Sequence, residues 1–441
     1  MKKLFSLSHA PLALLAILLA TSPRAGAAEV VPPPAVPWKI GAPIVTYCLG
    51  PGFPGGPALN AAAAAQLAEG GWNLVWCDSK DLDVAQRHGL RAMVINQRWL
   101  TPAALAAPKE LDALIDSVKQ HPAFYGYYLT DEPKADEFPA LGKLVAHVRE
   151  RDPGHLGFIN LNPTYANNTQ LGTKGNTVEA YAEHLRQYVK IVQPTLLSYD
   201  HYQFMNSGDN PGYFLNLAMI REQSLAAGLP FMNIVQASCW VPGSAASPQA
   251  PRVPNGDEMR YLVYTTLAYG AQGISYYGYC FPRHEGGIAR ADGTPTPLYH
   301  ALKPLNREFL AIATALQPLQ SLGVYHAGMM PPGGKALPKD AAFALDPSIP
   351  AMNYKSPERV QGVLLGVFGP TEKTPAEATH ALVVNLDYRQ ARTVTVQANA
   401  PLEVFDATTG VWSAAGGVRS ELKLPGGGGR LVRLAKNTAA K

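Results

Sequence analysis

The chain is 441 residues long, but it is poor in cysteine and has no cluster of positive charge. Its 37 lysines and arginines stand against 33 aspartates and glutamates, so the formal net charge is only +4, and the basic residues are scattered. Proteins that bind nucleic acid concentrate basic residues in a patch or along a helix, so we expect no nucleic-acid partner. The sequence also lacks the Gly-x-Ser-x-Gly, P-loop and Gly-x-Gly-x-x-Gly motifs in their required contexts. Acyl transfer, nucleotide hydrolysis and dinucleotide chemistry therefore have no support.

Each of the four cysteines falls at or just past the C-terminal end of a predicted strand: Cys48, Cys77, Cys239 and Cys280. No close pair of cysteines or histidines shares a loop, and no carboxylate cluster has the EF-hand pattern, so we expect no metal and no cofactor. In an oxidising compartment a disulfide is possible, but the sequence does not choose among the three pairings. Buried free thiols are the alternative.

The N-terminus carries an apolar run that is too short to cross a membrane. The run extends from Pro11 to Ala20, after the basic start Met1-Lys2-Lys3 and before the small residues Ala25-Gly26-Ala27. A membrane span needs roughly 20 apolar residues, whereas this pattern is typical of a secretory signal peptide. We therefore predict that residues 1–27 are removed and that the mature protein is secreted or periplasmic, with no membrane segment.

Between residues 40 and 320, short apolar or aromatic runs alternate with helical patterns. The expected strands are Ile44–Cys48, Trp72–Cys77, Arg91–Asn96, Phe124–Leu129, Leu156–Leu161, Leu196–Tyr199, Phe231–Val235 and Ile274–Tyr279. The expected helices are Asn60–Glu69, Leu82–His88, Pro108–Gln120, Pro139–Arg151, Thr177–Val192, Tyr213–Ala227, Gly256–Ala271 and Leu298–Leu316. Alternating strands and helices imply parallel βαβ units, and eight such units predict an α/β fold of the (β/α)₈ TIM-barrel type.

The remaining residues have a different texture and predict a second domain. We expect the barrel over residues 28–325, a Pro/Gly-rich linker over 326–340 and a small C-terminal antiparallel β-sandwich over 341–441. Expected strands of the sandwich are Val363–Phe368, His380–Leu386, Thr393–Gln397, Leu402–Phe405, Ser420–Leu424 and Arg430–Leu434. Turn residues at 406–410 and at 426–429 predict two hairpins.

The fourth predicted barrel strand ends in an adjacent carboxylate pair, Asp131-Glu132, which is followed by Pro133. The C-terminal ends of the strands are where a TIM barrel keeps its chemistry. Proline ends the strand and disfavours a helical conformation for the residue before it, so we expect Glu132 to be extended and presented at the rim. The alternative is that the two acids merely cap the next helix.

The other strand ends predict a rim of carboxylates, amides and aromatics. Its expected substrate-binding residues are Asp78, Asn96, Trp99, Asp131, Asn160, His201, Tyr202, Gln236, Trp240 and Tyr279. Sugar rings need this mixture, because their apolar faces stack on aromatic rings while their hydroxyls pair with amides and carboxylates. A carbohydrate is therefore the expected ligand.

Cleavage of a glycosidic bond commonly uses two carboxyl groups, one as acid and one as nucleophile or base. Glu132 is the expected acid, since aromatic neighbours and the adjacent Asp131 would both raise its pKa. Asp200, at the end of the sixth strand, is the expected second carboxylate, and Asp131, Asp78 and Glu285 are weaker candidates. A structural rim aspartate is the alternative for Asp200.

Thr130-Asp131-Glu132-Pro133 resembles the Asn-Glu-Pro-like motif of the clan A glycoside hydrolases, which include family 42 β-galactosidases and family 5 endoglycanases. The resemblance implies that Glu132 is the acid/base residue. Leu197–Tyr202, Gly273–Tyr277 and Asp292–Tyr299 extend it at the level of architecture over most of residues 40–325. These enzymes carry a nucleophilic glutamate at the end of the seventh strand, where this chain has Gln236, and glutamine is not an anionic nucleophile.

Three functions follow from these residues. The first is a secreted glycoside hydrolase in which Glu132 is the general acid and a second rim carboxylate, Asp200, is base or nucleophile. A carboxyl separation of about 6.5 to 9.5 Å would indicate inversion, and about 5 to 5.5 Å retention. The second is a non-hydrolytic carbohydrate-binding barrel, suggested by Gln236. The third is a barrel enzyme whose carboxylates hold a metal. The sugar, its linkage and the oligomeric state are not determined by the sequence.

Overall fold

The computed structural model describes residues 41–241, 247–248, 250–349, 352–353 and 362–435. The signal peptide predicted at 1–27 lies outside the described residues. Within the described ranges, no helix is long and apolar enough to cross a membrane.

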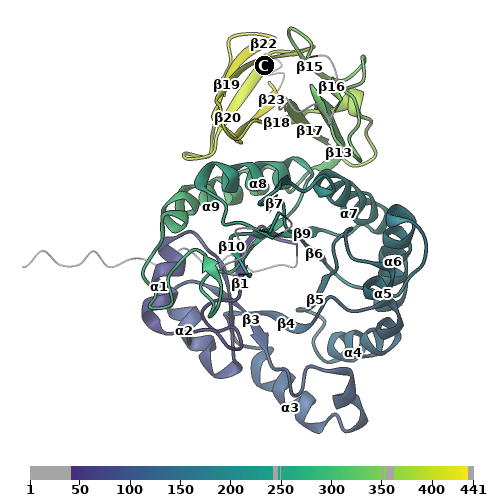
Figure 1. Ribbon diagram of the computed structural model, residues 1–441, viewed down its shortest axis with the longest axis vertical. Helices are drawn as coiled ribbons and strands as arrows, with labels where there is room; N and C mark the ends of the chain where they lie inside the picture. Colours follow the sequence, from purple (N-terminus) through teal and green to yellow (C-terminus); the bar gives the residue numbers. More distant parts are fainter. Residues whose placement is uncertain (1–40, 242–246, 249, 350–351, 354–361, 436–441) are drawn as a thin grey trace, which may run out of the picture. The chain divides into compact units, whose positions relative to one another are not determined.

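Eight parallel strands form one sheet that curves into a barrel, in the order β1-β11-β9-β6-β5-β4-β3-β2 (Figure 1). The first and last strands of this order, β1 and β2, lie side by side. Asn73 joins them, because its Oδ1 accepts from Val45 N–H at 2.8 Å while its own N–H donates to Val45 O at 3.1 Å. The strands are β1 Ile44–Cys48, β2 Leu74–Cys77, β3 Arg91–Ile95, β4 Phe124–Asp131, β5 Leu156–Leu161, β6 Leu197–His201, β9 Phe231–Gln236 and β11 Gly273–Tyr277. The predicted (β/α)₈ barrel is confirmed.

Helices surround the barrel strands (Figure 1). They are α1 Ala61–Glu69, α2 Leu82–Arg87, α3 Lys109–Val118, α4 Phe138–Arg151, α5 Asn168–Leu171, α6 Thr177–Val192, α7 Tyr213–Ala227, α8 Gly256–Ala268 and α9 Pro297–Leu316. Short 3₁₀ turns occupy Ser79–Asp81, Pro102–Ala106, Ala135–Glu137 and Pro375–Glu377. Every predicted barrel element is present, with its ends within about three residues of the expected ones.

Asparagine side chains start several of these helices. Asn176 Oδ1 accepts from the N–H groups of Val178 and Glu179, and the Glu179 side chain accepts from Asn176 N–H in return. Asn255 begins α8 with the same reciprocal pattern. Such capping satisfies N–H groups that have no partner inside the helix. Local sequence therefore determines where these helices begin.

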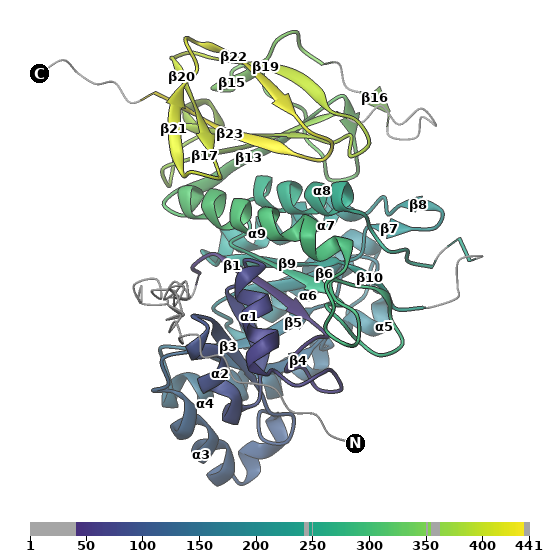
Figure 2. The same ribbon diagram turned by 90° about the vertical axis from the view of Figure 1, so that its left-hand side faces the viewer.

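Short strands decorate the loops that follow the barrel strands. They are β7 Phe204–Met205 paired with β8 Gly208–Asp209, and β10 Ser238–Cys239 paired with β12 Glu285–Gly286. Figure 2 shows β7, β8 and β10 at one end of the barrel. Long loops at one end are the arrangement expected for an active-site face.

The C-terminal residues form two antiparallel sheets with a shared core, as predicted. The larger sheet has the order β13-β17-β18-β23-β20-β21, and the smaller one has the order β15-β19-β22. Their strands are β13 Gln320–Ala327, β15 Phe343–Leu345, β17 Val363–Gly369, β18 His380–Asn385, β19 Arg392–Ala398, β20 Leu402–Asp406, β21 Val411–Ala414, β22 Arg419–Leu424 and β23 Gly429–Leu434. A short parallel pair, β14 Met329–Met330 and β16 Met352–Asn353, lies outside these sheets. Apolar side chains from both sheets pack into one cluster, which defines a β-sandwich.

Two local expectations are wrong here. The boundary expected at residue 325 falls inside β13, whose Gln320–Ala327 pair with β17, so the sandwich begins before the Pro/Gly-rich segment. The turn at 426–429 does not close a hairpin, because β22 pairs with β19 and β23 pairs with β18 and β20. It crosses between the two sheets instead. The hairpin at 406–410, between β20 and β21, is confirmed.

Helix α8 packs against β17 and β18 of the larger sheet as well as against the barrel. Gly366 of β17 makes a close approach possible, since a Cβ on this residue would lie 2.1 Å from the carbonyl oxygen of Ala268. In α8, every residue from Glu258 to Ala268 except Arg260 is buried. A helix buried on both sides belongs to the interior of a larger body.

Candidate active site

A cavity of about 510 Å³ opens where the barrel strands end. This volume lies in the range of small-molecule sites, roughly 300 to 1,000 Å³. The cavity is lined by Cys48, Leu49, Phe53, Trp76, Gln97, Tyr128, Asp131, Glu132, Phe158, Asn160, Asp200, Tyr202, Ile234, Trp240 and Tyr277. It therefore combines three carboxyl groups with aromatic walls at the end of the barrel that commonly holds the active site.

The alternation of side chains along each strand decides which residues reach the cavity. Phe158 and Asn160 of β5 both line it, as do Asp200 at the end of β6 and Tyr202 just beyond that strand. Residues i and i+2 of a strand face the same way, and the residue between them faces the surrounding helices. His201 is that intervening residue on β6.

Glu132 has an unusual backbone conformation. Its φ is +44°, in the left-handed region, which a residue with a Cβ rarely adopts. We expected an extended conformation, and the structure shows that this was wrong. Two hydrogen bonds hold the strained backbone: Glu132 N–H donates to Asn160 O at 2.9 Å, and Asn162 Nδ2 donates to Glu132 O at 3.1 Å.

Strain of this kind costs about 1–3 kcal/mol and gathers at functional sites, where the surrounding structure maintains it. Pro133 is buried behind Glu132 and removes one N–H from the turn. The neighbouring strand β5 therefore sets the direction of the Glu132 side chain, which lines the cavity.

The three carboxyl groups belong to one hydrogen-bonded network. Asn160 Nδ2 donates to Asp131 Oδ1 at 3.1 Å and to Asp200 Oδ1 at 2.9 Å. Ser198 Oγ donates to Asn160 Oδ1 at 3.0 Å and so orients the amide. Asp200 and Glu132 lie close enough that each shifts the pKa of the other. Two carboxylates at such close range repel each other, which favours a proton on one of them.

Burial raises the pKa values of all three acids, and the charges of neighbouring carboxylates add to the shifts of Glu132 and Asp200. Burial is the largest cause of the raised pKa of Asp200, which is only 3% exposed, and the charges of Glu132 and Asp131 add to it. Burial and the charge of Asp131 raise the pKa of Glu132. Burial raises the pKa of Asp131, and the bond from Asn160 opposes the shift. Asp131 and Glu132 are nevertheless accessible through the open mouth of the cavity, whereas Asp200 lies on its floor.

Aromatic rings form the walls around this cluster. Trp76 packs edge-on against Tyr128 with centroids 5.5 Å apart, and against Phe158 at the same distance. On another side Tyr202 packs against Trp240 at 4.5 Å and against Tyr277 at 4.8 Å. These walls surround the carboxyl cluster and offer flat surfaces to a ligand.

Six of the expected site residues line the cavity: Asp131, Glu132, Asn160, Asp200, Tyr202 and Trp240. The structure places three others at local turns or near them. Asp78 caps a 3₁₀ turn by accepting from Lys80 N–H. Asn96 accepts from the N–H groups of Arg98 and Trp99, and the Arg98 guanidinium covers the Trp99 ring.

Three more expected residues, His201, Tyr279 and Gln236, are buried in structural roles. His201 is fully buried, and its Nδ1 is hydrogen-bonded to Asn216 Oδ1 at 2.9 Å. Tyr279 is 2% exposed and accepts from Gln66 at 3.0 Å, because the strand ends before it and Gly278, with φ +88°, turns the chain away.

Gln236 has both atoms of its amide engaged with main-chain groups. Its Oε1 accepts from Phe204 N–H at 2.9 Å, and its Nε2 donates to Phe204 O at 2.9 Å and Arg252 O at 2.6 Å. The side chain is fully buried and does not line the cavity. The position at which the resemblance implies a nucleophile therefore clamps two loops together.

Several cavity residues were not expected from the sequence. The clearest are Trp76, Tyr128, Phe158 and Tyr277, each of which lies on a predicted barrel strand. The period-two pattern could have identified two of them, since Phe158 lies two residues before Asn160 and Trp76 lies two before Asp78. Their apolar character favours a core assignment when only the sequence is read.

All four cysteines are buried and free of disulfides. Cys48 lines the cavity, 3.3 Å from Ser275 Oγ, and burial raises the pKa of its thiol to about 12. In the part of the chain that the structure describes, no group of three or more His, Cys, Asp or Glu side chains is arranged to hold a metal ion.

No protein-family model matches the chain, and no curated protein matches it. Solved structures with a similar backbone include xylanase 10B from Thermotoga maritima, at 11% identity and a TM-score of 0.38, over 61% of this chain and 96% of that one. A family GH27 β-L-arabinopyranosidase from Geobacillus stearothermophilus aligns at 10% identity and a TM-score of 0.46, over 91% and 97%. A glycoside hydrolase family 5 mannosidase from Rhizomucor miehei aligns at 11% identity and a TM-score of 0.40, over 64% and 95%. At this level of likeness the comparisons assign no activity to this chain.

Proposed function

We propose that the protein is a glycoside hydrolase in which Glu132 is the general acid. The observation that carries this proposal is the pair of Glu132 and Asp200, which line one aromatic cavity and shift each other's pKa. A carboxyl group that keeps its proton near neutral pH is what protonation of a leaving oxygen requires. The aromatic walls and the Asn160 amide suit the apolar faces and the hydroxyls of a sugar ring.

The two standard mechanisms place the catalytic carboxyl groups about 5 to 5.5 Å or about 6.5 to 9.5 Å apart, with the reacting anomeric carbon between them. We propose that the substrate enters between Glu132 and Asp200 and separates them. Glu132 then gives its proton to the glycosidic oxygen as the bond from that oxygen to the anomeric carbon breaks.

Asp200 is the proposed base in the same scheme, once the proton that it holds in the empty site has passed to Glu132 as the substrate separates the pair. It takes a proton from water while the water oxygen forms the new bond to the anomeric carbon, so one proton enters the pair for each that leaves. During the reaction the carboxylates face a positively charged, oxocarbenium-like transition state, which their negative charge stabilises. Asp131 adds to this charge and keeps the pKa of Glu132 raised.

A second candidate is a carbohydrate-binding barrel without hydrolysis. It is favoured by Gln236, which the structure uses as a clamp at the end of the seventh barrel strand. In that case the carboxyl pair would be a polar floor that holds a sugar. Both candidates predict sugar binding, and only the first predicts turnover.

The decisive experiment is Glu132→Gln, tested with a panel of 4-nitrophenyl glycosides and defined oligosaccharides. We expect kcat to fall by about 10²-fold or more, which is typical for loss of a general acid, while sugar binding remains. Glu110→Gln is the control, because Glu110 is exposed on α3 and outside the cavity. Hydrolysis that survives Glu132→Gln would refute the assignment of the acid, and sugar binding with no hydrolysis by the wild-type protein would favour the second candidate.

We also propose that the protein acts in the periplasm or outside the cell, on the pattern of residues 1–27. N-terminal sequencing of the protein recovered from its natural compartment tests this proposal. A mature chain that retains the apolar run from Pro11 to Ala20 would contradict it.

A further inference from the structure

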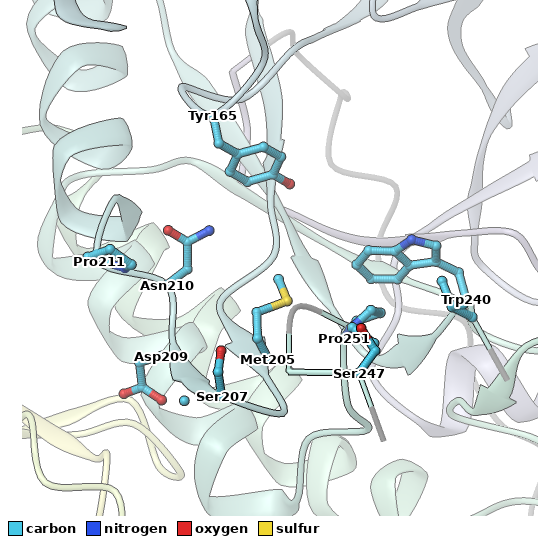
Figure 3. Close-up of a pocket in the computed structure, with 12 residues that line it drawn as sticks. Tyr165, Met205, Ser207, Asp209, Asn210, Pro211, Trp240, Ser247 and Pro251 are labelled. Carbon is cyan, nitrogen blue, oxygen red and sulfur yellow. The ribbon is translucent and has the colours of Figure 1, made fainter. Parts of the chain in front are cut away.

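A second cavity of about 680 Å³ adjoins the candidate active site. It is lined by Tyr165, Met205, Ser207, Gly208, Asp209, Asn210, Pro211, Trp240, Val241, Ser247, Ala250 and Pro251. Figure 3 shows Tyr165 and Trp240 on different sides of this space, with Met205 below Tyr165 and Asn210 beside Pro211. Trp240 lines both cavities, so the two spaces share a wall.

Tyr165 places the second cavity close to the carboxyl pair. The charges of Asp200 and Glu132 both contribute to its raised pKa, after burial, so its hydroxyl lies within electrostatic range of them. The ring also packs edge-on against His201, with centroids 5.0 Å apart. Tyr165 is therefore held in place although it is 48% exposed.

The lining of the second cavity includes large apolar side chains that are exposed. Among the described residues, Tyr165 and Val241 are two of the six exposed large hydrophobic side chains, and both line this cavity. Polar groups stand beside them at Ser207 and Asn210. Exposed apolar surface that is concave and edged with hydrogen-bonding groups marks a ligand site more often than a bare surface.

Two loops contribute to the lining of the second cavity, one after Phe204 and one before Arg252, and their main chains are hydrogen-bonded to each other. Asn206 N–H donates to Ala250 O at 2.9 Å, and Ser207 N–H donates to Pro248 O at 2.8 Å. The Gln236 side chain is hydrogen-bonded to Phe204, where one of these loops begins, and to Arg252, where the other ends. This cavity wall is therefore a supported structure, and the fully buried Gln236 is part of its support.

The sandwich also contributes to this support. Tyr388 Oη donates to Asp209 Oδ1 at 2.9 Å, and Asp209 lines the cavity. The Tyr388 ring packs edge-on against Phe204, with centroids 5.7 Å apart. A contact from a separate sheet thus holds the loop that carries Met205 and Asn210.

We propose that the second cavity binds the saccharide ring next to the one that reacts, so that the substrate is an oligosaccharide of at least two rings. This proposal rests on the proposed function, because it takes the carboxyl pair as the place of cleavage. The ring whose anomeric carbon reacts lies over Asp200 in the first cavity. The next ring extends past Trp240 and stacks on Tyr165.

The test uses the Glu132→Gln protein, which is expected to bind without turnover. The probe is a set of α- and β-linked gluco-, galacto-, manno- and xylo-oligosaccharides of one to four rings, titrated by calorimetry. We expect an affinity gain of about tenfold or more from one ring to two within the series that binds, a size that corresponds to the burial of one further ring face.

Two substitutions of Tyr165 separate stacking from folding. Tyr165→Ala should remove the gain for the second ring while the single-ring affinity stays the same, and Tyr165→Phe should keep most of it because the ring remains. Val178→Ala is the control, since Val178 is 47% exposed on α6 and lines neither cavity. In the protein with active Glu132, Tyr165→Ala should raise KM for two-ring substrates far more than it changes kcat.

The outcomes distinguish the two proposals. Equal affinity for one and two rings, or a gain that Tyr165→Ala leaves intact, overturns the second-cavity proposal while single-ring binding still supports the proposed function. Binding of none of the saccharides to wild-type or Glu132→Gln protein overturns both proposals.

Discussion

Replacement of Asp200 by asparagine should make the protein more stable at neutral pH while it removes activity. Asp200 is 3% exposed and accepts from Asn160 Nδ2 at 2.9 Å. Asparagine keeps that acceptor oxygen, and its Nδ2 group can donate to Glu132 as a protonated Asp200 would. The variant therefore copies the neutral form of the pair and can carry no charge at this position.

The size of the effect follows from the raised pKa of Asp200. Its pKa in the folded protein lies well above the ordinary value, so between the two values the folded chain holds a proton that the unfolded chain has released. Stability of the wild-type protein then falls as pH rises, by about 1.4 kcal/mol per pH unit for one such group, and the loss ends when pH passes the folded pKa. Below a pH of about 4 the term is fully favourable and the two proteins should differ least.

The assay is the free energy of unfolding of both proteins in urea at several pH values from about 4 to 7. We expect the difference between Asp200→Asn and wild type to grow with pH in favour of the variant. Asp136→Asn, at an exposed position in a 3₁₀ turn, is the control and should show no such growth. Parallel pH profiles of Asp200→Asn and wild type would refute the view that Asp200 retains a proton because it is buried beside Glu132.

Two further substitutions test the site from other directions. Gln236→Glu restores the residue type implied by the resemblance. It should destabilise the protein by at least about 2 kcal/mol and yield no new activity, because a carboxylate cannot donate to Phe204 O and Arg252 O. A thermal unfolding scan and a glycosidase assay check both effects, and a variant that is as stable as wild type and more active would contradict the prediction. Asp131→Asn should move the alkaline limb of the kcat/KM pH profile to lower pH, since the charge of Asp131 raises the pKa of Glu132 and the acid must stay protonated. A limb at unchanged or higher pH would show that the charge of Asp131 does not raise the pKa of the acid.

The sequence predicts the barrel well because its signals are local. Runs such as Ile44–Cys48 and Thr177–Val192 have the predicted bounds, since apolar period and capping asparagines lie within the segments themselves. The rim is predicted from strand ends, and Asp200 and Tyr202 do line the cavity there. The prediction fails for His201, where strand alternation alone would have placed the side chain on the helix side.

Other features depend on partners that are distant in the sequence. The left-handed turn at Glu132 exists because Asn160 and Asn162 hold it from the next strand. The clamp by Gln236 depends on how the loops at Phe204 and Arg252 come together. No local pattern encodes either arrangement. The sequence therefore predicts a substrate-binding role for Gln236, because glutamine is typical of a polar rim. In the structure this side chain holds two loops together.

Helix α8 limits how the protein can be shortened. All its residues from Glu258 to Ala268 except Arg260 are buried, and Gly366 of the sandwich lies directly against its last turn. A truncated protein that ends after α9 would leave that side of the helix facing water, with a tyrosine- and leucine-rich surface exposed to other chains. The barrel alone should therefore aggregate on expression, and any attempt to engineer or crystallise it should retain residues 320–435.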